Sequence, residues 1–341
     1  MPRLRTALRR LIAYLAYYSG FVWLYAALRL RQRAVVLMYH RVLPVGAESF
    51  SSDGIVVSPA TFERHLSFLR RHFTPLDADG FMACAARREF PRRACLVTFD
   101  DGWFDNQRYA LPLLKQFGVP AVLFVATGYV GTQATFWQEA LTRLLFTASR
   151  SVPPVSSVLD EFGLGSLRSA ADGEARRLAR EFVTELKAAP PAEVDRVREK
   201  IVVAMERQGL PAPRSGDDRF LDWDSVRDLA ASGHFTIASH AHSHRPLTKL
   251  GRSGAVEDLE RSLCELERHG LGRPLMCAYP NGDYDSDVTA AAREAGLQMA
   301  FTTVSGHVAT GDDPLRLRRV NVHESACSSR AEFMCRILGI F

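Results

Sequence analysis

The sequence predicts an α/β protein in which parallel strands alternate with helices, arranged as a barrel or as a doubly wound sheet. Three observations lead to this fold class. Short runs rich in β-branched and aromatic residues alternate with longer amphipathic stretches, these stretches often end at glycine, and polar side chains directly follow the apolar runs. The 341 residues, 47% of them hydrophobic, suit about two domains or one large domain with an insertion.

Six apolar runs define the expected sheet. Each run holds four to seven residues and contains β-branched or aromatic residues. Near-continuous apolar runs of this length are typical of strands that are buried on both faces. The runs lie at residues 34–39, 95–99, 120–126, 235–238, 275–279 and 299–304.

The helices expected between these strands have recognisable ends. Ser58 followed by Pro59 is a typical helix start, and an apolar stripe of Phe62, Leu66 and Leu69 continues from it. Four further periodic stretches end next to a glycine, which readily adopts the positive φ that often follows a helix. These stretches lie at residues 104–117, 223–232, 255–269 and 286–295.

One block interrupts this alternation and divides the chain. Residues 137–216 contain helix-forming stretches without a convincing strand. We therefore expect a helical insertion over 137–216. The α/β domain is then formed by residues 33–136 and 217–341, and an N-terminal apolar or amphipathic helix is expected over residues 1–32.

The N-terminal segment carries no charge over residues 11–28 and has arginines on both sides. Eighteen uncharged residues reach the lower limit of what spans the hydrocarbon core of a bilayer. Tyrosine and tryptophan in this segment also suit a membrane interface. The sequence predicts a membrane-associated protein, by spanning or by lying in the interface, and the alternative is a cytoplasmic protein whose helix packs on the domain. The side chains hidden in that alternative are Leu11, Tyr14, Tyr18 and Trp23.

Composition argues against two other classes of protein. The net charge of +5 is spread over separate arginine clusters rather than one basic stripe with aromatics, so no nucleic-acid partner is expected. The six cysteines form no close pair of the CxxC kind, so neither a zinc finger nor the disulfide framework of a small secreted domain is expected. Any metal ligands are therefore expected among other residue types.

Two neighbouring acids, Asp100 and Asp101, directly follow the apolar run 95–99. Holding two carboxylates close together is costly unless a cation or a shared proton relieves their repulsion. An ordinary strand end followed by an Asx-type turn, with Gly102 supplying the tight geometry, explains the same residues without any chemistry. The two interpretations are distinguished by the rest of the chain.

Three histidines follow the run 235–238 in the same way. His240 and His244 are four residues apart, so one helical turn would place both on one side, with His242 pointing elsewhere. A histidine-rich surface turn is the alternative. Like the acids, however, the histidines follow a strand, where α/β barrels and sheets collect their functional residues. Two histidines and one carboxylate would hold a metal ion with positions open for water, and the second carboxylate would be left to act as a base.

These motifs resemble those of the polysaccharide deacetylases of the NodB-homology family (carbohydrate esterase family 4). "TFDDG" at 98–102 resembles the first family motif, "SHAHSHRPL" at 239–247 the second and "CAYPNGDYD" at 277–285 the third. The resemblance covers approximately residues 34–136 and 217–325. It implies a distorted (β/α) barrel with fewer than eight strands. The activity that it implies is metal-dependent removal of N-acetyl groups from an acetylated sugar or surface polysaccharide.

The resemblance also implies roles for individual residues. Asp100 would be the general base, and the ligands of one divalent metal ion, most often zinc, would be Asp101, His240 and His244. The backbone near Asn281 would help to stabilise the oxyanion. All of these residues follow predicted strands.

Further candidates lie in or near the motifs. His40, in a "YH" strand similar to that of the bacterial poly-N-acetylglucosamine deacetylases, is the expected general acid. His323 stands near the position of the usual C-terminal acid, but its spacing differs from the family's Leu-x-His form. Tyr279 and Trp103 are candidate substrate contacts, and Trp103 is equally suited to core packing.

The chain departs from the family pattern at two positions. Ala241 stands where serine or threonine is usual, and Ala278 stands where the family often carries an arginine that orients the base. Arg318 and Arg319 are candidates to replace that arginine. Two other functions stay open, an O-acetyl esterase acting on a polysaccharide and a carbohydrate-binding homologue without turnover. A base beside a complete set of metal ligands favours an enzyme, because a binding protein needs no base there.

Overall fold

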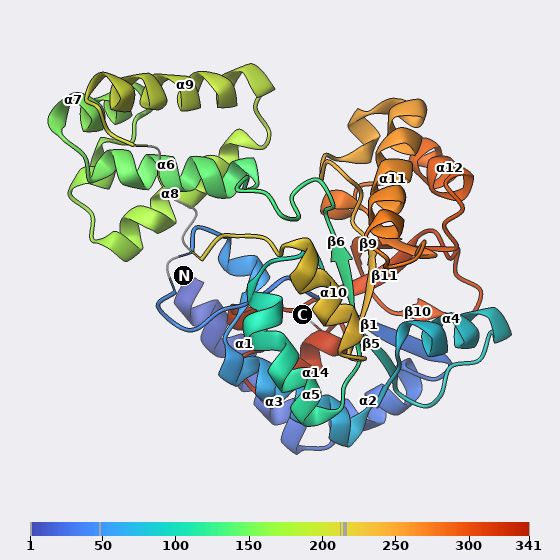
Figure 1. The fold of residues 1–341 in the computed structure, drawn as a ribbon. Helices are drawn as coiled ribbons and strands as arrows, with labels where there is room; N and C mark the ends of the chain where they lie inside the picture. The colour runs from blue at the N-terminus through green and yellow to red at the C-terminus, as the bar shows by residue number, and fades with distance from the viewer. Residues whose placement is uncertain (1, 48, 212, 214–216, 341) are drawn as a thin grey trace. The chain divides into compact units, whose positions relative to one another are not determined.

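The computed structural model divides the chain into two compact units (Figure 1). The first unit comprises Met1–Val45, Asp53–Thr132 and Phe220–Phe341, and the second comprises Gly46–Ser52 and Gln133–Arg219. The structure describes every residue except 1, 48, 212, 214–216 and 341.

The barrel strands of the first unit match the predicted runs closely, with one addition, and four short strands lie outside the barrel. The barrel strands are β1 (Arg33–Tyr39), β5 (Ala94–Phe99), β6 (Ala121–Val125), β7 (Phe235–Ser239), β8 (Met276–Ala278), β9 (Met299–Ser305) and β11 (Leu317–Asn321). The short strands outside the barrel are β2 (Arg41–Val42), β3 (Val56–Val57), β4 (Thr74–Pro75) and β10 (Val308–Ala309). The sequence does not predict β11, whose segment LRRVN contains two adjacent arginines.

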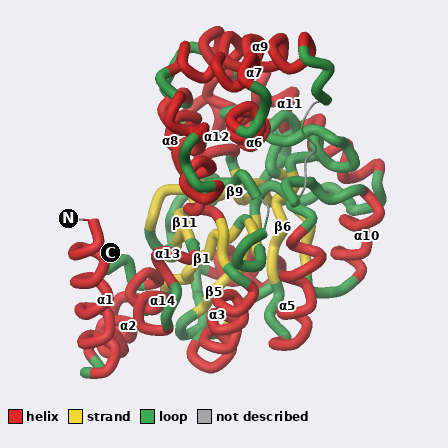
Figure 2. Tube along the Cα trace, turned by 90° about the vertical axis from the view of Figure 1, so that its left-hand side faces the viewer, coloured by secondary structure: helices red, strands yellow, loops and turns green. Residues whose placement is uncertain are grey.

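The seven barrel strands form a closed ring of parallel pairs, which helices surround (Figures 1 and 2). Their order around the ring is β1, β11, β9, β8, β7, β6 and β5, and β5 pairs with β1 to close it. All seven pairs of neighbours are parallel. Outside the ring, β10 runs antiparallel to β1 and β4 runs parallel to β5. The prediction of a (β/α) barrel with fewer than eight strands is confirmed.

Helices cover the outer face of the ring. Helix α3 (Pro59–His72) begins as predicted, with the Ser58 side chain accepting a hydrogen bond from the backbone N–H of Thr61 at 3.2 Å. A π-helical turn, Asn106–Ala110, leads into α5. After the N-terminal pair, the other α-helices described in the barrel unit are α4 (Ala78–Arg87), α5 (Leu111–Phe117), α10 (Trp223–Ala231), α11 (Gly251–Arg268), α12 (Ser286–Glu294), α13 (Glu324–Cys327) and α14 (Arg330–Ile337).

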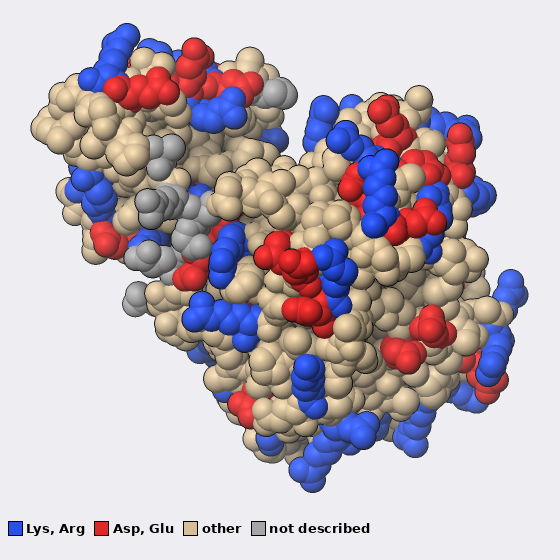
Figure 3. Space-filling view, viewed as in Figure 1, with Lys and Arg blue, Asp and Glu red and all other residues tan. Residues whose placement is uncertain are grey.

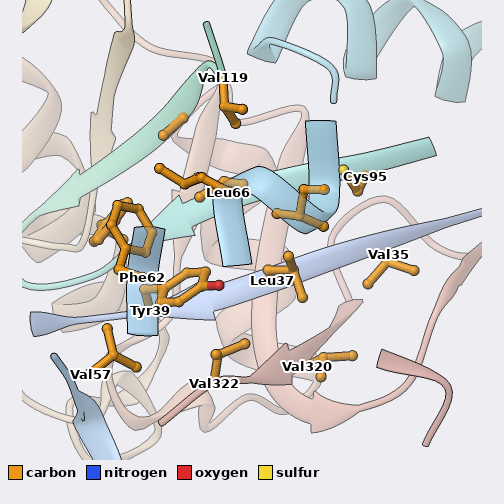
Figure 4. Packing of buried hydrophobic residues seen from close by; sticks show 14 of the residues in the cluster. Val35, Leu37, Tyr39, Val57, Phe62, Leu66, Cys95, Val119, Val320 and Val322 are labelled. Atoms are coloured by element: carbon orange, nitrogen blue, oxygen red, sulfur yellow. The ribbon is translucent and has the colours of Figure 1, made fainter. Parts of the chain in front are cut away.

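Strand β1 shows how the core is divided. Its side chains alternate between the two faces of the ring. Val35, Leu37 and Tyr39 belong to the cluster that packs against α3 and the other outer helices (Figure 4). Ala34 and Val36 belong to a second cluster, which includes residues of β6, β8 and β9. Both faces of the strand are apolar, as the near-continuous apolar run predicts.

Two helices replace the single helix that the sequence predicts over residues 1–32. They are α1 (Pro2–Tyr18) and α2 (Phe21–Arg29), separated at Gly20, whose φ of 82° breaks the helix. The pair is bent by 81°. Among the described residues no single helix is long and apolar enough to cross a membrane, and this bent pair meets that criterion only by its combined length and composition. Helix α1 contacts α14, and α2 leads into β1.

The second unit contains helices and no strand among its described residues. Its helices are α6 (Trp137–Ser149), α7 (Pro153–Ser156), α8 (Asp172–Leu186) and α9 (Pro191–Arg207), with short 3-10 turns between α7 and α8. The predicted helical insertion, 137–216, lies within this unit, which also includes residues 46–52. Its apolar core is its own, formed by residues such as Leu145, Ala179, Val183 and Ile201.

A buried histidine of α3 ties this helix to β1 and to α13. The Tyr39 hydroxyl lies 3.1 Å from His65 Nδ1, and His65 Nε2 lies 2.7 Å from the carbonyl oxygen of Cys327. Because a carbonyl only accepts, Nε2 carries the proton, and Nδ1 accepts a hydrogen bond from the Tyr39 hydroxyl. The ring is stacked on Phe333 with 3.8 Å between centroids. Burial lowers the pKa of His65 from 6.5 to about 4, so the ring is neutral in the folded protein.

We predict that His65 makes the free energy of unfolding fall in mildly acid solution. The unfolded chain protonates this histidine near pH 6.5 and the folded chain only near pH 4, so its stabilising contribution is complete above pH 6.5 and is lost as the pH falls toward 4. His65→Gln removes this contribution. Between pH 7 and pH 5, the wild type should therefore lose about 2 kcal/mol more of its free energy of unfolding than the variant. Urea unfolding at both pH values measures the losses, and equal losses would contradict the prediction.

Candidate metal and catalytic site

Three barrel strands deliver the predicted motifs to one rim of the barrel. Asp100 and Asp101 follow β5, His240 and His244 lie in the loop after β7, and Asn281 lies in the turn after β8. Because the barrel strands are parallel, their carboxyl ends share one rim. The position of the candidate residues in the fold therefore agrees with the sequence analysis.

Asp101, His240 and His244 form a cluster that could hold a metal ion. One ligand atom from each lies within 4.8 Å of the other two. Nε2 of His244 is 3.3 Å and Nε2 of His240 is 3.5 Å from Oδ1 of Asp101. His242 lies outside this cluster, with its Nδ1 3.1 Å from the hydroxyl of Thr127. The structure thus brings together the three ligands proposed from the sequence.

A helical turn does not bring the two histidines together, contrary to the interpretation of their four-residue spacing. Residues 240–246 form an irregular loop in which Ala241 and His244 have φ values of 60° and 55°. This left-handed conformation costs a residue with a side chain roughly 1–2 kcal/mol. The Asp258 carboxylate of α11 supports the loop by accepting hydrogen bonds from the backbone N–H groups of His242 at 2.7 Å and Ser243 at 3.1 Å.

Neighbouring groups orient two of the candidate ligands. His240 Nδ1 lies 2.8 Å from the carbonyl oxygen of Ala278, so Nδ1 donates and Nε2 is left to face Asp101. Trp103 Nε1 donates to Oδ2 of Asp101 at 2.7 Å, and Oδ1 faces the histidines. Two imidazole nitrogens and one carboxylate oxygen are donors that suit zinc and related divalent ions. The donor chemistry therefore fits a metal ion.

The ionisation of Asp101 also suits a metal ligand. Burial by itself would raise the pKa of this carboxyl group, because it disfavours the charged form. Hydrogen bonding with His240 and His244 outweighs burial and holds the pKa of Asp101 well below its ordinary value. Asp101 is therefore a carboxylate at neutral pH.

The side chains of Trp103 and Tyr279, the two candidate substrate contacts, lie in the protein interior. Both side chains are fully buried. The Trp103 ring is stacked on Phe220 at 4.3 Å, and the Arg41 guanidinium lies 4.1 Å from the ring centroid. The Tyr279 hydroxyl donates to the carbonyl oxygen of Leu315 at 3.0 Å. Because neither ring has an exposed face for a sugar, the part that Trp103 plays is to orient Asp101.

Asp100 is paired with a buried arginine from β11. The two terminal nitrogens of Arg319 each donate to one carboxylate oxygen of Asp100, both at 2.7 Å. Arg319 Nε donates to the carbonyl oxygen of Thr302 at 2.9 Å, which fixes the guanidinium. Arg319, rather than the exposed Arg318, thus supplies the arginine that Ala278 lacks. Burial alone would raise the pKa of Asp100, but the charge of Arg319 lowers it below its ordinary value.

His40 lies next to the same carboxylate. It follows β1, which pairs with β5, and its Nε2 is 3.8 Å from Oδ2 of Asp100. Its Nδ1 is buried and has no hydrogen-bond partner among the described residues. The other candidate acid, His323, is instead paired with the hydroxyl of Ser325, 3.0 Å from its Nδ1, at the start of α13. Of these two histidines, the structure therefore brings His40 to Asp100.

Asn281 is exposed in the turn after β8, with φ of 56°. Its carbonyl oxygen accepts a hydrogen bond from the Thr303 hydroxyl of β9 at 3.0 Å. The next residue, Gly282, has φ of 73°, and a Cβ there would lie 2.2 Å from Thr303 Oγ1. Only glycine fits so close to the neighbouring strand, and this contact fixes the backbone around Asn281 at the rim.

A parallel barrel that carries a carboxylate base candidate and an Asp-His-His donor set at one rim has the architecture of a barrel hydrolase. The sequence profile of the polysaccharide deacetylase family matches residues 87–300, which is more than half of the chain. The protein belongs to the polysaccharide deacetylase family.

Curated relatives match a shorter part of the chain. The putative polysaccharide deacetylase YxkH of Bacillus subtilis is 27% identical over 137 residues, which are 39% of this chain and 44% of YxkH. The poly-beta-1,6-N-acetyl-D-glucosamine N-deacetylase of Staphylococcus aureus is 32% identical over 112 residues, which are 29% of this chain and 38% of the relative. The chain thus spans less than half the length of each of these relatives.

Two solved structures share the fold over most of the chain. IcaB from Ammonifex degensii has a TM-score of 0.57 and 21% identity, and the match covers 89% of this chain and 97% of IcaB. The Streptococcus pyogenes deacetylase PplD, solved in complex with acetate, has a TM-score of 0.55 and 16% identity, covering 86% of this chain and 94% of PplD. At these identities the likeness is one of fold.

We predict weaker metal binding when Trp103 loses its hydrogen bond to Asp101. Trp103→Phe keeps a buried aromatic ring but removes the N–H donor, and loss of such an orienting partner typically weakens metal affinity about 10- to 100-fold. Competition with a zinc chelator measures the affinity of the metal-free protein. Trp223→Phe is the matched control, because Trp223 is stacked on His269, outside the cluster, and it should bind like the wild type. If Trp103→Phe bound zinc with wild-type affinity, the Trp103 N–H would not be needed to orient Asp101 for metal binding.

Proposed function

We propose that this protein is a metal-dependent N-deacetylase that hydrolyses N-acetyl groups of a polysaccharide and releases acetate. The observation that carries this proposal is the arrangement around two adjacent aspartates. Asp100 is held ionised and oriented by Arg319, and Asp101 belongs to the donor cluster with His240 and His244. The name of the Staphylococcus aureus relative supports a polymer of N-acetylglucosamine as the substrate class.

The metal in this proposal is one divalent ion, zinc, bound by Asp101, His240 and His244. When bound there, such an ion supplies Lewis-acid chemistry, polarising the acetyl carbonyl and lowering the pKa of water. The protein prepares the ligands for it. Trp103 and the Ala278 carbonyl orient Asp101 and His240, and the low pKa of Asp101 keeps its carboxylate ionised.

The side chains of the protein then account for the proton transfers. Asp100 accepts a proton from the attacking water, and the bidentate contact with Arg319 fixes the direction in which its oxygens point. His40 donates a proton to the departing nitrogen, a step that amide hydrolysis needs because an unprotonated amine anion is a very poor leaving group. Backbone N–H groups around Asn281 stabilise the oxyanion.

The two rival functions differ from this proposal in identifiable ways. The binding-only alternative gained its support from the missing arginine at Ala278, and the contact between Arg319 and Asp100 removes that support. An O-acetyl esterase would use the same residues, but an alkoxide leaves far more easily than an amine anion. The part played by His40 therefore separates amide from ester hydrolysis.

We predict that Asp100→Asn abolishes acetate release while metal binding is retained. The substitution removes the proton acceptor but none of the three metal ligands, so turnover should fall roughly 100-fold or more. Acetate release from β-1,6-linked N-acetylglucosamine oligomers in the presence of zinc measures turnover, and the chelator competition measures metal binding and confirms folding. Near-wild-type turnover in this variant would show that Asp100 is not the base. If the metal-loaded wild type released no acetate from a panel of N- and O-acetylated sugars, the protein would be a binding homologue.

We predict that His40→Gln affects amide hydrolysis more than ester hydrolysis. Loss of the acid should slow N-acetyl hydrolysis roughly 100-fold or more, whereas an O-acetyl ester of the same sugar should be affected much less. The matched control is His323→Gln, because His323 is paired with Ser325, and it should leave both rates unchanged. Equal losses on the two substrates in His40→Gln would exclude protonation of the amine as the function of His40.

A further inference from the structure

Helices α1 and α2 each expose a row of large apolar side chains, and the two rows together are here called the α1–α2 apolar face. Its residues are spaced three or four apart in each helix, which places them on one side. Exposed fractions reach 63% for Leu15, 76% for Tyr18, 65% for Leu24 and 71% for Leu28. The members of the face are Leu8, Leu11, Ile12, Leu15, Tyr18, Phe21, Leu24 and Leu28. Soluble proteins rarely expose such a contiguous apolar surface unless something covers it.

The opposite side of the two helices is packed on the barrel unit, so the orientation of the apolar face is fixed. Ala13, Val22 and Ala26 are fully buried. Tyr17 lies 6.4 Å and Trp23 lies 6.0 Å from Phe68 of α3, measured between ring centroids. These buried residues and the two aromatic rings thus hold the helices against the barrel, and the residues of the apolar face point outward.

A contact between α1 and α14 strengthens this attachment. Arg10 Nε donates to the Glu332 carboxylate at 3.1 Å. In the cytoplasmic alternative raised from the sequence, the packed helix hides Leu11, Tyr14, Tyr18 and Trp23. Trp23 does pack on Phe68, but the other three side chains remain exposed although the helices lie against the barrel.

Charge identifies the chemistry of the surface that would cover this face. The first 47 residues contain no aspartate or glutamate. Arg9, near the middle of α1, and Arg29 and Arg31, at and just after the end of α2, are exposed. Figure 3 shows basic side chains along the lower edge of the molecule, where α2 lies in Figure 1. An apolar stripe flanked by arginines and free of acids complements a bilayer with anionic headgroups.

A membrane-spanning arrangement and a second copy of the chain fit these observations less well. Spanning would require the 81° bend to straighten and the buried side of α1 and α2 to leave the barrel. Self-association through this face would bring together two helix pairs that carry arginines and no acid of their own. Binding in the lipid interface is compatible with the bend between α1 and α2, with the packing of their buried side on the barrel and with their positive charge.

We propose that the α1–α2 apolar face lies in the interface of an anionic phospholipid bilayer, with the helices parallel to the surface. Because α2 leads into the start of β1, α2 lies near the amino ends of the barrel strands, and α1 packs along α14. The candidate site lies at the carboxyl ends of the strands, so the rim stays open to a polymer when the face is bound. This inference does not depend on the proposed function, because it rests on the exposure, packing and charge of the helices alone.

Vesicle sedimentation with the full chain tests the proposal. The vesicles are phosphatidylcholine alone or a mixture of phosphatidylcholine and phosphatidylglycerol, and the variants are Leu15→Glu and Leu24→Glu. Each variant should weaken binding to the mixed vesicles at least about tenfold, because it places a charge where an apolar side chain enters the interface. Val45→Glu is the matched control: Val45 is 92% exposed and lies outside the face, and this variant should bind like the wild type.

Two further measurements complete the test: the dependence of binding on lipid charge, and the oligomeric state of the protein. Arg29→Gln should weaken binding to the mixed vesicles about fivefold and have little effect on phosphatidylcholine alone. Circular dichroism of each variant confirms folding. Binding of Leu15→Glu and Leu24→Glu equal to that of the wild type would overturn the proposal. A wild type that ignores vesicles but forms dimers that Leu24→Glu dissociates would assign the face to a second copy, and release from vesicles only by detergent would indicate a span.

Discussion

Two carboxylates that are adjacent in the chain and both buried set the main constraint on this fold. Asp100 and Asp101 follow a strand whose residues are all buried, and neither carboxylate is more than slightly exposed. A buried charge without a partner costs several kcal/mol, and a whole domain is typically stable by only about 5–15 kcal/mol. Each carboxylate therefore needs its own compensating groups. Arg319 compensates Asp100, and Trp103 with the two histidines compensates Asp101.

The order of strands in the barrel places these compensating groups. Counted from β5, the strand that ends in the two aspartates, β11 lies beyond β1 on one side and β7 lies beyond β6 on the other. Arg319 comes from β11, and His240 and His244 come from the loop after β7. Closure of the ring through β1 and β5 is what brings β11 within reach. In an open sheet cut between β1 and β5, the aspartates and Arg319 would lie on strands near opposite edges.

Much of this arrangement can be predicted from the sequence because it follows from local patterns. Six barrel strands are apolar runs, and the aspartates and histidines directly follow two of them. The seventh strand, β11, cannot be recognised as an apolar run because it contains two arginines. A buried Arg319 is acceptable there only because it pairs with a carboxylate more than two hundred residues earlier in the chain. The same is true of Trp103: its sequence position beside the acids suggested a sugar contact, and its burial is decided by Phe220 and Arg41. The uncharged stretch 11–28 did indicate the N-terminal helix, but the exposed side of α1 and α2 is determined by contacts with α3 and α14.

The backbone at the rim shows why the detailed geometry of the site escapes local rules. Asp101, Ala241, His244 and Asn281 all have φ between 55° and 78°, in the left-handed region that side chains disfavour. They lie in the three loops that carry the candidate site, and each conformation costs roughly 1–2 kcal/mol. Tertiary hydrogen bonds hold these loops, from Asp258 to the histidine loop and from Thr303 to the turn at Asn281. The barrel therefore supplies a rigid frame. Contacts from neighbouring strands and helices hold the loops in a left-handed backbone conformation that their own sequences disfavour. The residue types could be recognised in the sequence, whereas the conformation that makes them converge belongs to the closed barrel as a whole.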